Sequence, residues 1–541
     1  MSERSNTAEL LRERARSAPT RTALIEPDGA RAWRKLSFAE LEREVDLDAH
    51  AFVRAGLQRG DRVCVFVKPG SEWAAIVFAL FRIGALPVLI DPAMGRAGLL
   101  ACVERIRPRG FIGIPLASAI KLAFPRSFAS VEVALVAGPL PLGGRTLRGL
   151  RRAEDGAFPS AATLDSDRAA VLFTSGSTGP AKGVSYTHGM FRAQVAALRE
   201  LNGMREGDVD LACFAPFALF GPALGLTTVL PRIDFSHPAQ ADPAEIVRAI
   251  REHGAVQTFG SPAIWRRVAP WAAERGITLP SLRRLMIAGA PVHPPLIESC
   301  LALLAPEADV YTPYGATEAL PVACIGGREI LARHRAATES GAGNCIGTLA
   351  PFIEARVIRV TDDVLPAWSE SLVVARGEAG ELVVRGPQVT REYELEPEHT
   401  ARAKIPDGTS VWHRMGDVVR EDGAGRLWFL GRKSHRLATA HGTLFPVGIE
   451  NAFNVHLAVR RSALVGVGAR GAERAVLVVE LAPGKRPSAA LATEILARRQ
   501  QVSDCRVVEE LLFHEQFPVD LRHNAKIDRA ALKAWAEERL A

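Results

Sequence analysis

A short loop rich in glycine, hydroxyl side chains and one lysine is the most informative stretch of the chain. Residues 173–184 read Phe-Thr-Ser-Gly-Ser-Thr-Gly-Pro-Ala-Lys-Gly-Val, and an apolar run at residues 169–173 before it predicts a buried strand. Glycines let the backbone approach an anion closely, and hydroxyl and N–H groups can point at phosphate oxygens. Lys182 adds a charge suited to a polyphosphate. The loop is not a Walker A motif, because it has Ala181-Lys182-Gly183 where that motif needs Gly-Lys-Ser/Thr.

Three later segments carry side chains that could complete a phosphate and nucleotide site. Residues 311–318 read Tyr-Thr-Pro-Tyr-Gly-Ala-Thr-Glu and end in a carboxylate, which suits Mg²⁺ bridging phosphates. Residues 412–417, Trp-His-Arg-Met-Gly-Asp, end in a second carboxylate, and residues 517–529 contain Lys526. Taken singly, these are explained as well by turns and by a solvated lysine. Their order along one chain favours a shared site.

The elements that must position these side chains follow a βαβ rhythm through the first 330 residues. Residues 62–67, 86–91, 255–259 and 284–288 predict strands, and residues 72–82 predict a helix. This rhythm is typical of doubly wound parallel sheets, in which ligands bind beyond the carboxyl ends of the strands. From about 345 to 430, short strands between glycine-rich turns predict a small β-barrel, and the chain after Gly431 reads as mixed α+β.

Composition limits the classes of function. At 541 residues with 23% charged and 48% hydrophobic residues, the chain predicts a soluble protein of two or more domains. The net charge of +7 comes from scattered arginines, so we expect no nucleic-acid partner. The seven cysteines are dispersed without a CxxC pair, which favours a reducing cytoplasm over a zinc site. The start of the chain lacks a signal core, and the apolar stretch at residues 73–90 is broken by Arg82, Gly84 and Pro87, so no membrane anchor is expected.

In order and spacing, the segments resemble those of the adenylate-forming superfamily, which includes acyl-CoA synthetases, nonribosomal peptide synthetase adenylation domains and luciferases. The resemblance covers nearly the whole chain. It implies that ATP, with Mg²⁺, activates a carboxylate as an acyl-AMP and releases pyrophosphate. The implied fold is α/β: an N-terminal adenylation domain of residues 1–431, with doubly wound subdomains and a barrel at about 345–430, then a mobile α+β lid domain of residues 432–541.

The resemblance also implies roles for single residues. Tyr314 would pack on adenine, Thr317 would contact the α-phosphate, and Glu318 would be the metal ligand. Asp417 and Arg432 would reach the ribose. The other positions implied in nucleotide binding are Thr174, Ser175, Gly176, Ser177, Thr178, Gly179, Lys182, Gly289, Ala290 and Gly315.

Lys526 falls at the catalytic lysine of the superfamily, with Ala525 in the place of a glycine. In the family that lysine contacts the attacking carboxylate and offsets charge at the α-phosphate. Together with Thr317 and a third residue, His441, it makes up our candidate catalytic set.

The chain departs from the family at two places after the barrel. At the hinge, Ser434 stands where an aspartate or lysine is usual. CoA ligases carry a Gly-x-Arg stretch that lines the tunnel for the pantetheine thiol. Alignment on Ile449-Glu450 puts His441 at that glycine and Thr443 at that arginine, so an imidazole would obstruct the tunnel. An alignment offset by one residue would put Gly442 there instead.

An aromatic segment at residues 214–225 corresponds to the entrance of the acyl pocket in the family and suits an alkyl substrate. Together with residues 89–92, 111–115 and 522–527, it resembles one branch, the β-lactone synthetases of bacterial long-chain olefin biosynthesis. Enzymes of that branch adenylate a 2-alkyl-3-hydroxyalkanoic acid, whose own 3-hydroxyl then closes the lactone. Intramolecular attack needs no thiol tunnel. The candidate pocket residues are Phe217, Phe220, Phe259 and Gly289.

Two alternatives stay open at this point. A long-chain fatty acid–CoA ligase would share the first half-reaction and differ in the second. An adenylating module that loads a carrier protein would need a partner, and no carrier-like domain follows position 541. The branch resemblance also leaves assembly with other olefin-pathway enzymes open.

Overall fold

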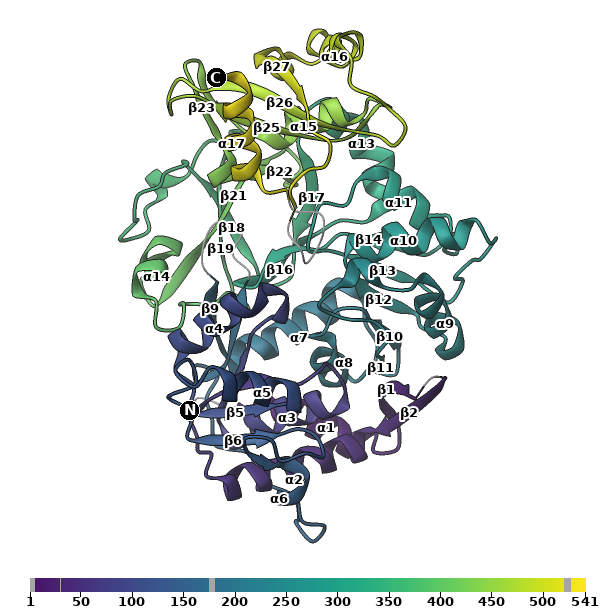
Figure 1. Ribbon diagram of the computed structural model, residues 1–541, viewed down its shortest axis with the longest axis vertical. Coiled ribbons are helices and arrows are strands. Elements are labelled where there is room, and N and C mark those ends of the chain that lie inside the picture. Colours follow the sequence, from purple (N-terminus) through teal and green to yellow (C-terminus); the bar gives the residue numbers. More distant parts are fainter. Residues whose placement is uncertain (1–4, 30, 175–180, 520–526) are drawn as a thin grey trace.

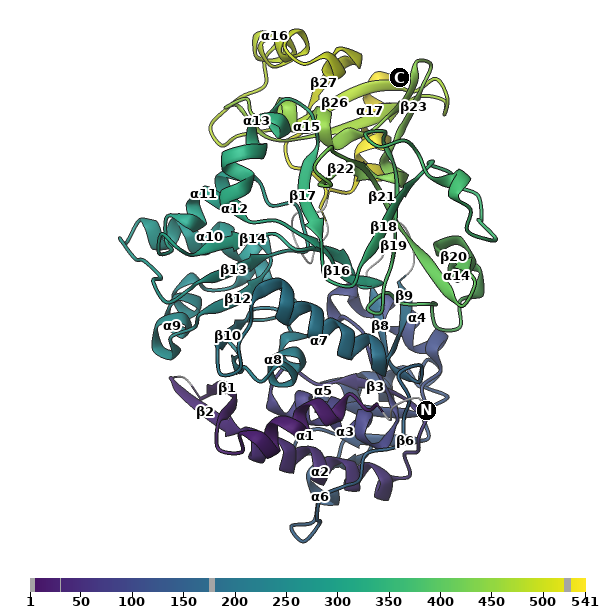
Figure 2. The same cartoon turned by 180° about the vertical axis from the view of Figure 1, so that it is seen from behind.

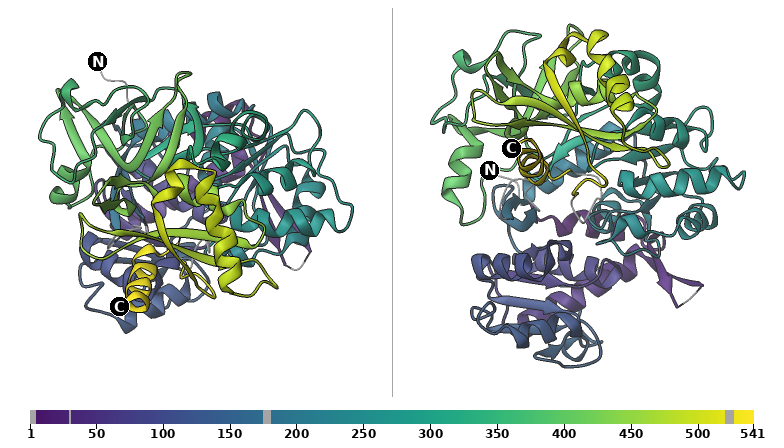
Figure 3. Two further views of the ribbon diagram at one scale, coloured as in Figure 1. Left: turned by 90° about the horizontal axis from the view of Figure 1, so that it is seen from above. Right: turned by 45° about the horizontal axis from the view of Figure 1, so that its top comes forward.

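The computed structural model describes residues 5–29, 31–174, 181–519 and 527–541 and has a mixed α/β fold. Two mostly parallel sheets make up the N-terminal part, an antiparallel sheet follows, and a smaller α+β part ends the chain (Figure 1). The views from behind and from above place the C-terminal part over one end of the molecule (Figures 2 and 3). This arrangement confirms the predicted α/β class with a large N-terminal and a smaller C-terminal domain. The exact boundary at 431/432 stays a prediction.

The first sheet has seven strands, parallel except for the β8–β9 hairpin. Helices α2 (Phe38–Ala55), α3 (Ser71–Ile83), α4 (Gly95–Ile106) and α5 (Pro115–Ala123) belong to this part of the chain. The strands in spatial order are β7 (Arg145–Thr146), β6 (Val133–Val136), β5 (Gly110–Gly113), β3 (Arg62–Phe66), β4 (Leu86–Leu89), β8 (Arg168–Thr174) and β9 (Lys182–Thr187).

The second sheet also has seven strands and is parallel except for the β1–β2 pair. Its strands in spatial order are β14 (Asp309–Tyr311), β13 (Arg284–Ile287), β12 (Gln257–Gly260), β10 (Val209–Ala212), β11 (Thr227–Val229), β1 (Thr22–Asp28) and β2 (Ala32–Ser37). Its helices, with the first helix of the chain, are α1 (Ala8–Ser17), α7 (His188–Asn202), α8 (Phe217–Leu224), α9 (Pro243–His253), α10 (Pro262–Ala273) and α11 (Pro294–Leu301).

The third sheet is antiparallel and has eight strands. It takes in the barrel strands predicted between 345 and 430 and extends to two earlier ones, β15 and β16. The strands are β15 (Tyr314–Ala316), β16 (Ala319–Cys324), β17 (Asn344–Leu349), β22 (Leu427–Arg432), β21 (Ser410–Glu421), β19 (Gly380–Arg385) and β18 (Glu354–Ile358), with β20 (Lys404–Asp407) paired to β21.

The C-terminal part is built on a small three-stranded sheet and a hairpin. In the described part of the chain, no helix is both long and apolar enough to cross a bilayer. The elements are β23 (Leu437–Thr439), β24 (Gly442–Leu444), α15 (Pro446–Asn454), β25 (Val459–Val467), β26 (Arg474–Leu481), α16 (Ala489–Leu496), β27 (Val508–Phe513) and α17 (Arg529–Leu540).

Helices α2 and α3 form the centre of the N-terminal core. Ser37 and Glu40 form a capping box at the start of α2, and Gly56 ends that helix with φ of 100°. Helix α3 is buried on nearly all sides, so its Arg82, with 0% exposure, needs partners inside the protein. It ion-pairs with Asp46 at 2.6 Å and with Glu42 at 2.9 Å, which joins α3 to α2.

We predict that Arg82→Met lowers the free energy of unfolding by about 3–5 kcal/mol, because it removes one partner from the buried carboxylate of Asp46 and from the half-buried Glu42. Urea unfolding followed by tryptophan fluorescence measures the change. Arg59→Ala is the control, since its 2.8 Å pair with Asp167 has an arginine side chain that is 56% exposed. That pair should contribute about 1 kcal/mol or less. Equal losses in the two variants would contradict the assignment.

Candidate active site

One large cleft, of about 3840 Å³, lies where the carboxyl ends of the parallel strands face the third sheet and the C-terminal part. Its walls include residues that follow β3, β4 and β5 of the first sheet, and residues that follow β10, β12 and β13 of the second. Figure 3 shows the C-terminal part lying over the N-terminal part of the chain. The predicted site residues that line the cleft are Lys182, Phe217, Phe220, Phe259, Gly289, Ala290, Tyr314, Gly315, Thr317, Glu318, Asp417 and Arg432.

A buried carboxylate connects three strands at the cleft. Asp417, 3% exposed, lies opposite Arg432 across β21 and β22, and Arg432 Nε is 3.0 Å from Asp417 Oδ1. The hydroxyl of Tyr314 on β15 donates to Asp417 Oδ2. Burial, and then the negative charge of Asp417, raise the pKa of Tyr314 well above its usual value. The phenol therefore stays protonated as a donor, and the three predicted nucleotide residues form one cluster.

Glu318 is held at the cleft by two residues of the segment after β19. Tyr393 Oη donates to Glu318 Oε1 at 2.7 Å. The backbone oxygen of Glu318 accepts from Thr390 N at 2.8 Å and from Thr390 Oγ1 at 3.0 Å. The backbone oxygen of Thr317 accepts from the Tyr186 hydroxyl. Both residues predicted to contact phosphate or metal are thus fixed by neighbours far away in sequence.

Lys404 lies behind Glu318 and is 4% exposed. Its ammonium donates to Thr390 O and, at 3.1 Å, to Thr390 Oγ1, while no carboxylate of the described residues is within ion-pair distance. Burial lowers the pKa of Lys404 to about 7, although Glu318 opposes the shift. Burial and the nearby Lys404 hold the pKa of His413 well below its usual value. Sequence reasoning missed Lys404 and Tyr393.

Two glycines and a lysine shape the floor of the cleft. Gly289 has φ of 93°, a conformation that favours glycine. A Cβ on Gly315 would lie 2.7 Å from Ala319 O, so the β15–β16 turn requires glycine there. Lys182 Nζ is 5.3 Å from the centre of the Tyr393 ring. The predicted residues that lie outside the described part, or whose side chains do, are Thr174, Ser175, Gly176, Ser177, Thr178, Gly179 and Lys526.

The predicted acyl-pocket phenylalanines form one aromatic group in the cleft wall. Phe217 stacks on Phe259 with ring centres 4.8 Å apart, and Phe214 and Phe259 are 5.5 Å apart. Phe220 lies 6.1 Å from Phe217 and 6.2 Å from Phe191 on α7. A wall of this kind favours an alkyl ligand.

His441 is placed differently from the other candidates. It lies in the exposed turn between β23 and β24, and it is not among the residues that line the cleft. Ser434 of the hinge is also exposed. In this arrangement of the domains the structure does not bring His441 to the other site residues, and its role stays a prediction.

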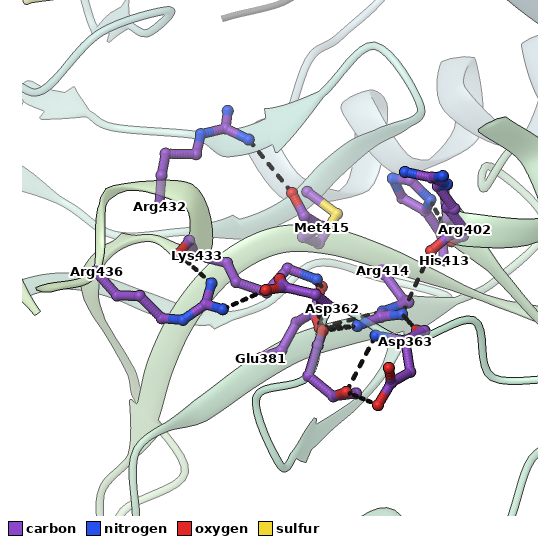
Figure 4. Close-up of polar contacts among 12 residues, drawn as sticks. Asp362, Asp363, Glu381, Arg402, His413, Arg414, Met415, Arg432, Lys433 and Arg436 are labelled. Atoms are coloured by element: carbon purple, nitrogen blue, oxygen red, sulfur yellow. Dashed lines mark hydrogen bonds and ion pairs between the residues drawn. The ribbon is translucent and has the colours of Figure 1, made fainter. Parts of the chain in front are cut away.

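Basic residues just after Arg432 anchor the start of the C-terminal part on the third sheet (Figure 4). Lys433 Nζ and Arg414 Nη2 both approach the buried Glu381, at 3.0 Å and 2.6 Å. Arg436 Nη2 is 2.5 Å from Asp362 Oδ2. These ion pairs hold the hinge segment against the third sheet and the loop after β18. Ser434, which lies between Lys433 and Arg436, is uncharged and adds no ion pair.

Glu318 fits the metal that the fold implies. It is a hard oxygen donor at the cleft wall, and Mg²⁺ prefers one or two carboxylates completed by phosphate oxygens and water. The described residues contain no cluster of three or more acidic, histidine or cysteine side chains that could hold a metal by themselves. The donor set is therefore one that a nucleotide would complete.

Comparison with known proteins finds a family model and curated relatives that cover most of the chain. The family model described as "AMP-binding enzyme" matches residues 11–394. An olefin beta-lactone synthetase of Stenotrophomonas maltophilia is 44% identical over 548 residues, covering 99% of this chain and 98% of the relative. The olefin beta-lactone synthetase of Xanthomonas campestris is 44% identical over 547 residues, covering 98% of both.

Solved structures of low sequence identity share the fold. An amide bond synthetase from Marinactinospora thermotolerans superposes with a TM-score of 0.82 at 23% identity, covering 98% of this chain and 99% of that one. O-succinylbenzoate coenzyme A synthetase from Bacillus subtilis, in complex with AMP, gives a TM-score of 0.75 at 20% identity, covering 97% and 98%.

The buried Lys404 leads to a prediction about stability and pH. Between pH 7 and 9 the folded lysine is neutral while the unfolded one carries a proton, so unfolding takes up a proton and stability rises with pH. Between pH 7 and 9, the free energy of unfolding of the wild type should rise by about 1–3 kcal/mol more than that of Lys404→Met. Chemical unfolding at several pH values measures the difference. Parallel pH curves for the two proteins would contradict a depressed pKa.

Proposed function

Because this chain belongs to the AMP-binding enzyme family, we propose that it activates a 2-alkyl-3-hydroxy acid with ATP and closes it to a β-lactone. The observation that carries the proposal is the 44% identity, over nearly the full length of both chains, to two olefin beta-lactone synthetases. The aromatic wall around Phe217 and Phe259 supports a substrate with long alkyl chains. Identity to 2-succinylbenzoate–CoA ligases is lower, 27% over 462 residues.

In the first half-reaction, a carboxylate oxygen of the acid attacks the α-phosphorus of ATP, and the bond to the pyrophosphate oxygen breaks. Tyr314 would pack on the base, and Asp417 would accept hydrogen bonds from the ribose while Arg432 balances its charge. Lys526 would offset charge at the α-phosphate. Glu318 would hold Mg²⁺, which neutralises phosphate charge when bound.

In the second half-reaction, the 3-hydroxyl oxygen attacks the carbonyl carbon of the acyl-AMP. The bond between that carbon and the phosphate oxygen breaks, AMP departs, and the hydroxyl proton balances the charge on the departing phosphate. The nucleophile and the electrophile belong to one molecule. The cleft therefore has to hold the substrate with its hydroxyl near its carbonyl carbon, and no CoA thiol is needed. A cleft wall that is largely apolar also limits competing attack by water.

We also propose that the enzyme works in the cytoplasm, on ATP and a long-chain acid, and that it assembles with enzymes of the same pathway. All seven cysteines are free and six of them are buried, which suits a reducing compartment. Their role is packing, because burial raises the pKa of thiols such as Cys213 and Cys300.

Glu318→Gln should raise the Mg²⁺ concentration needed for half-maximal pyrophosphate release by about tenfold or more, because a neutral amide is a weaker ligand. A metal titration at saturating ATP measures the shift. Glu252→Gln, on the distant helix α9, is the matched control and should leave the curve unchanged. An unchanged curve for Glu318→Gln would remove this residue from the metal site.

The proposed function is tested by product analysis with a 2-alkyl-3-hydroxy acid and ATP·Mg²⁺, with and without CoA. We expect one β-lactone per pyrophosphate in both cases. The acid that lacks the 3-hydroxyl should stop at the adenylate, because it has no internal nucleophile. Lys526→Ala should slow pyrophosphate release by about 10²–10³-fold, by analogy with lost oxyanion donors. Acyl-CoA formation at the rate of pyrophosphate release would instead establish a CoA ligase.

A further inference from the structure

One face of helix α7 forms a wall of the cleft beside the aromatic group. Its cleft-lining residues are Phe191, Gln194, Leu198 and Asn202, spaced by three and four residues so that they share one side of the helix. Phe191 lies 5.0 Å from the Tyr186 ring and 6.2 Å from the Phe220 ring. Gln194 therefore places an amide in the cleft wall beside the aromatic group.

The Gln194 side chain is buried without full hydrogen bonding. It is 2% exposed, and its Oε1 has no hydrogen-bond partner. Its Nε2 makes one long hydrogen bond, 3.5 Å, to the Tyr186 hydroxyl. An unsatisfied buried acceptor costs about 1–3 kcal/mol, so a bound ligand that donates a hydrogen bond would gain by meeting it.

Gln194 is close to the reacting centre through a short chain of contacts. The Tyr186 hydroxyl, which accepts from Gln194, donates to the backbone oxygen of Thr317. Thr317 directly precedes Glu318, so the amide lies two hydrogen bonds away from the residues proposed to meet the α-phosphate and metal. A substrate group near the carboxyl carbon would lie in this region.

We propose that Gln194 Oε1 accepts a hydrogen bond from the 3-hydroxyl group of the substrate, which makes Gln194 a specificity-determining residue. The inference rests on the proposed function, because it takes the substrate to be a 3-hydroxy acid. An amide is not a base, so Gln194 does not remove the hydroxyl proton. It orients the hydroxyl group, and a lone pair of the hydroxyl oxygen stays free to attack the acyl carbon. An analogue without the hydroxyl would leave the buried acceptor unpaired, and sites of this design reject such analogues strongly.

Asn202 provides a matched control on the same helix. It is also a buried cleft-lining amide, 6% exposed, and its Oδ1 also has no hydrogen-bond partner. It lies eight residues further along α7, which corresponds to about 12 Å along the helix axis. Asn202 Nδ2 donates to the backbone oxygen of Leu198 at 3.1 Å and has no hydrogen bond to Tyr186 or Thr317.

The test compares kcat/KM for the first turnover of pyrophosphate release, measured before a stalled adenylate can limit the rate. The substrates are the 3-hydroxy acid, its 3-deoxy analogue and its 3-fluoro analogue, which keeps the size but cannot donate a hydrogen bond. We expect the wild type to prefer the hydroxy acid. Gln194→Met should lose this preference by about 10- to 100-fold, through the hydroxy acid alone. Asn202→Leu should retain it. An unchanged preference in Gln194→Met overturns the proposal.

Two further measurements test the role of Gln194 even if Gln194→Met is unstable. Gln194→Leu replaces the methionine variant if the thermal midpoint of that variant falls. The wild type alone also tests the idea, because equal kcat/KM for the hydroxy and fluoro acids would overturn it without any substitution. Failure of the proposed function is separate: a wild type that prefers the hydroxy acid and forms no lactone would keep the hydroxyl contact and remove the β-lactone assignment.

Discussion

The structure depends on satisfying one buried carboxylate. Asp417 sits inside the protein, where an unpaired charge would cost several kcal/mol, and its partners come from different strands. Arg432 ends β22 and opens the hinge to the C-terminal part, and Tyr314 begins β15 at the floor of the cleft. Keeping these three side chains together fixes the cleft, the third sheet and the start of the hinge relative to one another.

A second consequence of burial is that charge at the cleft is arranged in layers. Glu318 faces the cleft, Tyr393 and Thr390 hold it, and Lys404 lies behind them without a carboxylate of its own among the described residues. A polyphosphate that enters would meet Lys182 and Arg432, which line the cleft, while Lys404 stays buried behind Thr390. Gln194 in the aromatic wall is linked to the Thr317 backbone oxygen through the Tyr186 hydroxyl, so the alkyl part of the proposed substrate would bind next to its reacting carboxyl group.

Local signals predicted much of this arrangement. The strands predicted at residues 62–67, 86–91, 255–259 and 284–288 appear as β3, β4, β12 and β13. Their formation could be predicted because a short apolar run bounded by small residues is a local signal for a buried strand. Tyr314 and Glu318 reach the cleft because they follow the carboxyl end of the parallel strand β14. Asp417 lies on β21 of the antiparallel third sheet and meets Tyr314 through a side-chain hydrogen bond. Tyr393, Lys404 and Gln194 could not be predicted, since their importance arises from contacts with residues 75, 14 and 8 positions away. His441 was predicted from its alignment position, but in this structure it lies in the exposed β23–β24 turn, away from the cleft. An alignment position does not determine the direction in which a hairpin turn projects.

The central claim is that the carboxylate is activated as an acyl-AMP and is then attacked by the 3-hydroxyl of the same molecule. Isotope transfer tests it most directly, with a 3-hydroxy acid that carries ¹⁸O in both carboxylate oxygens and, separately, in the hydroxyl. One carboxylate ¹⁸O should appear in AMP and the other in the lactone carbonyl, while the hydroxyl ¹⁸O should stay in the lactone ring. Unlabelled AMP, or loss of the hydroxyl ¹⁸O from the lactone, would contradict the account.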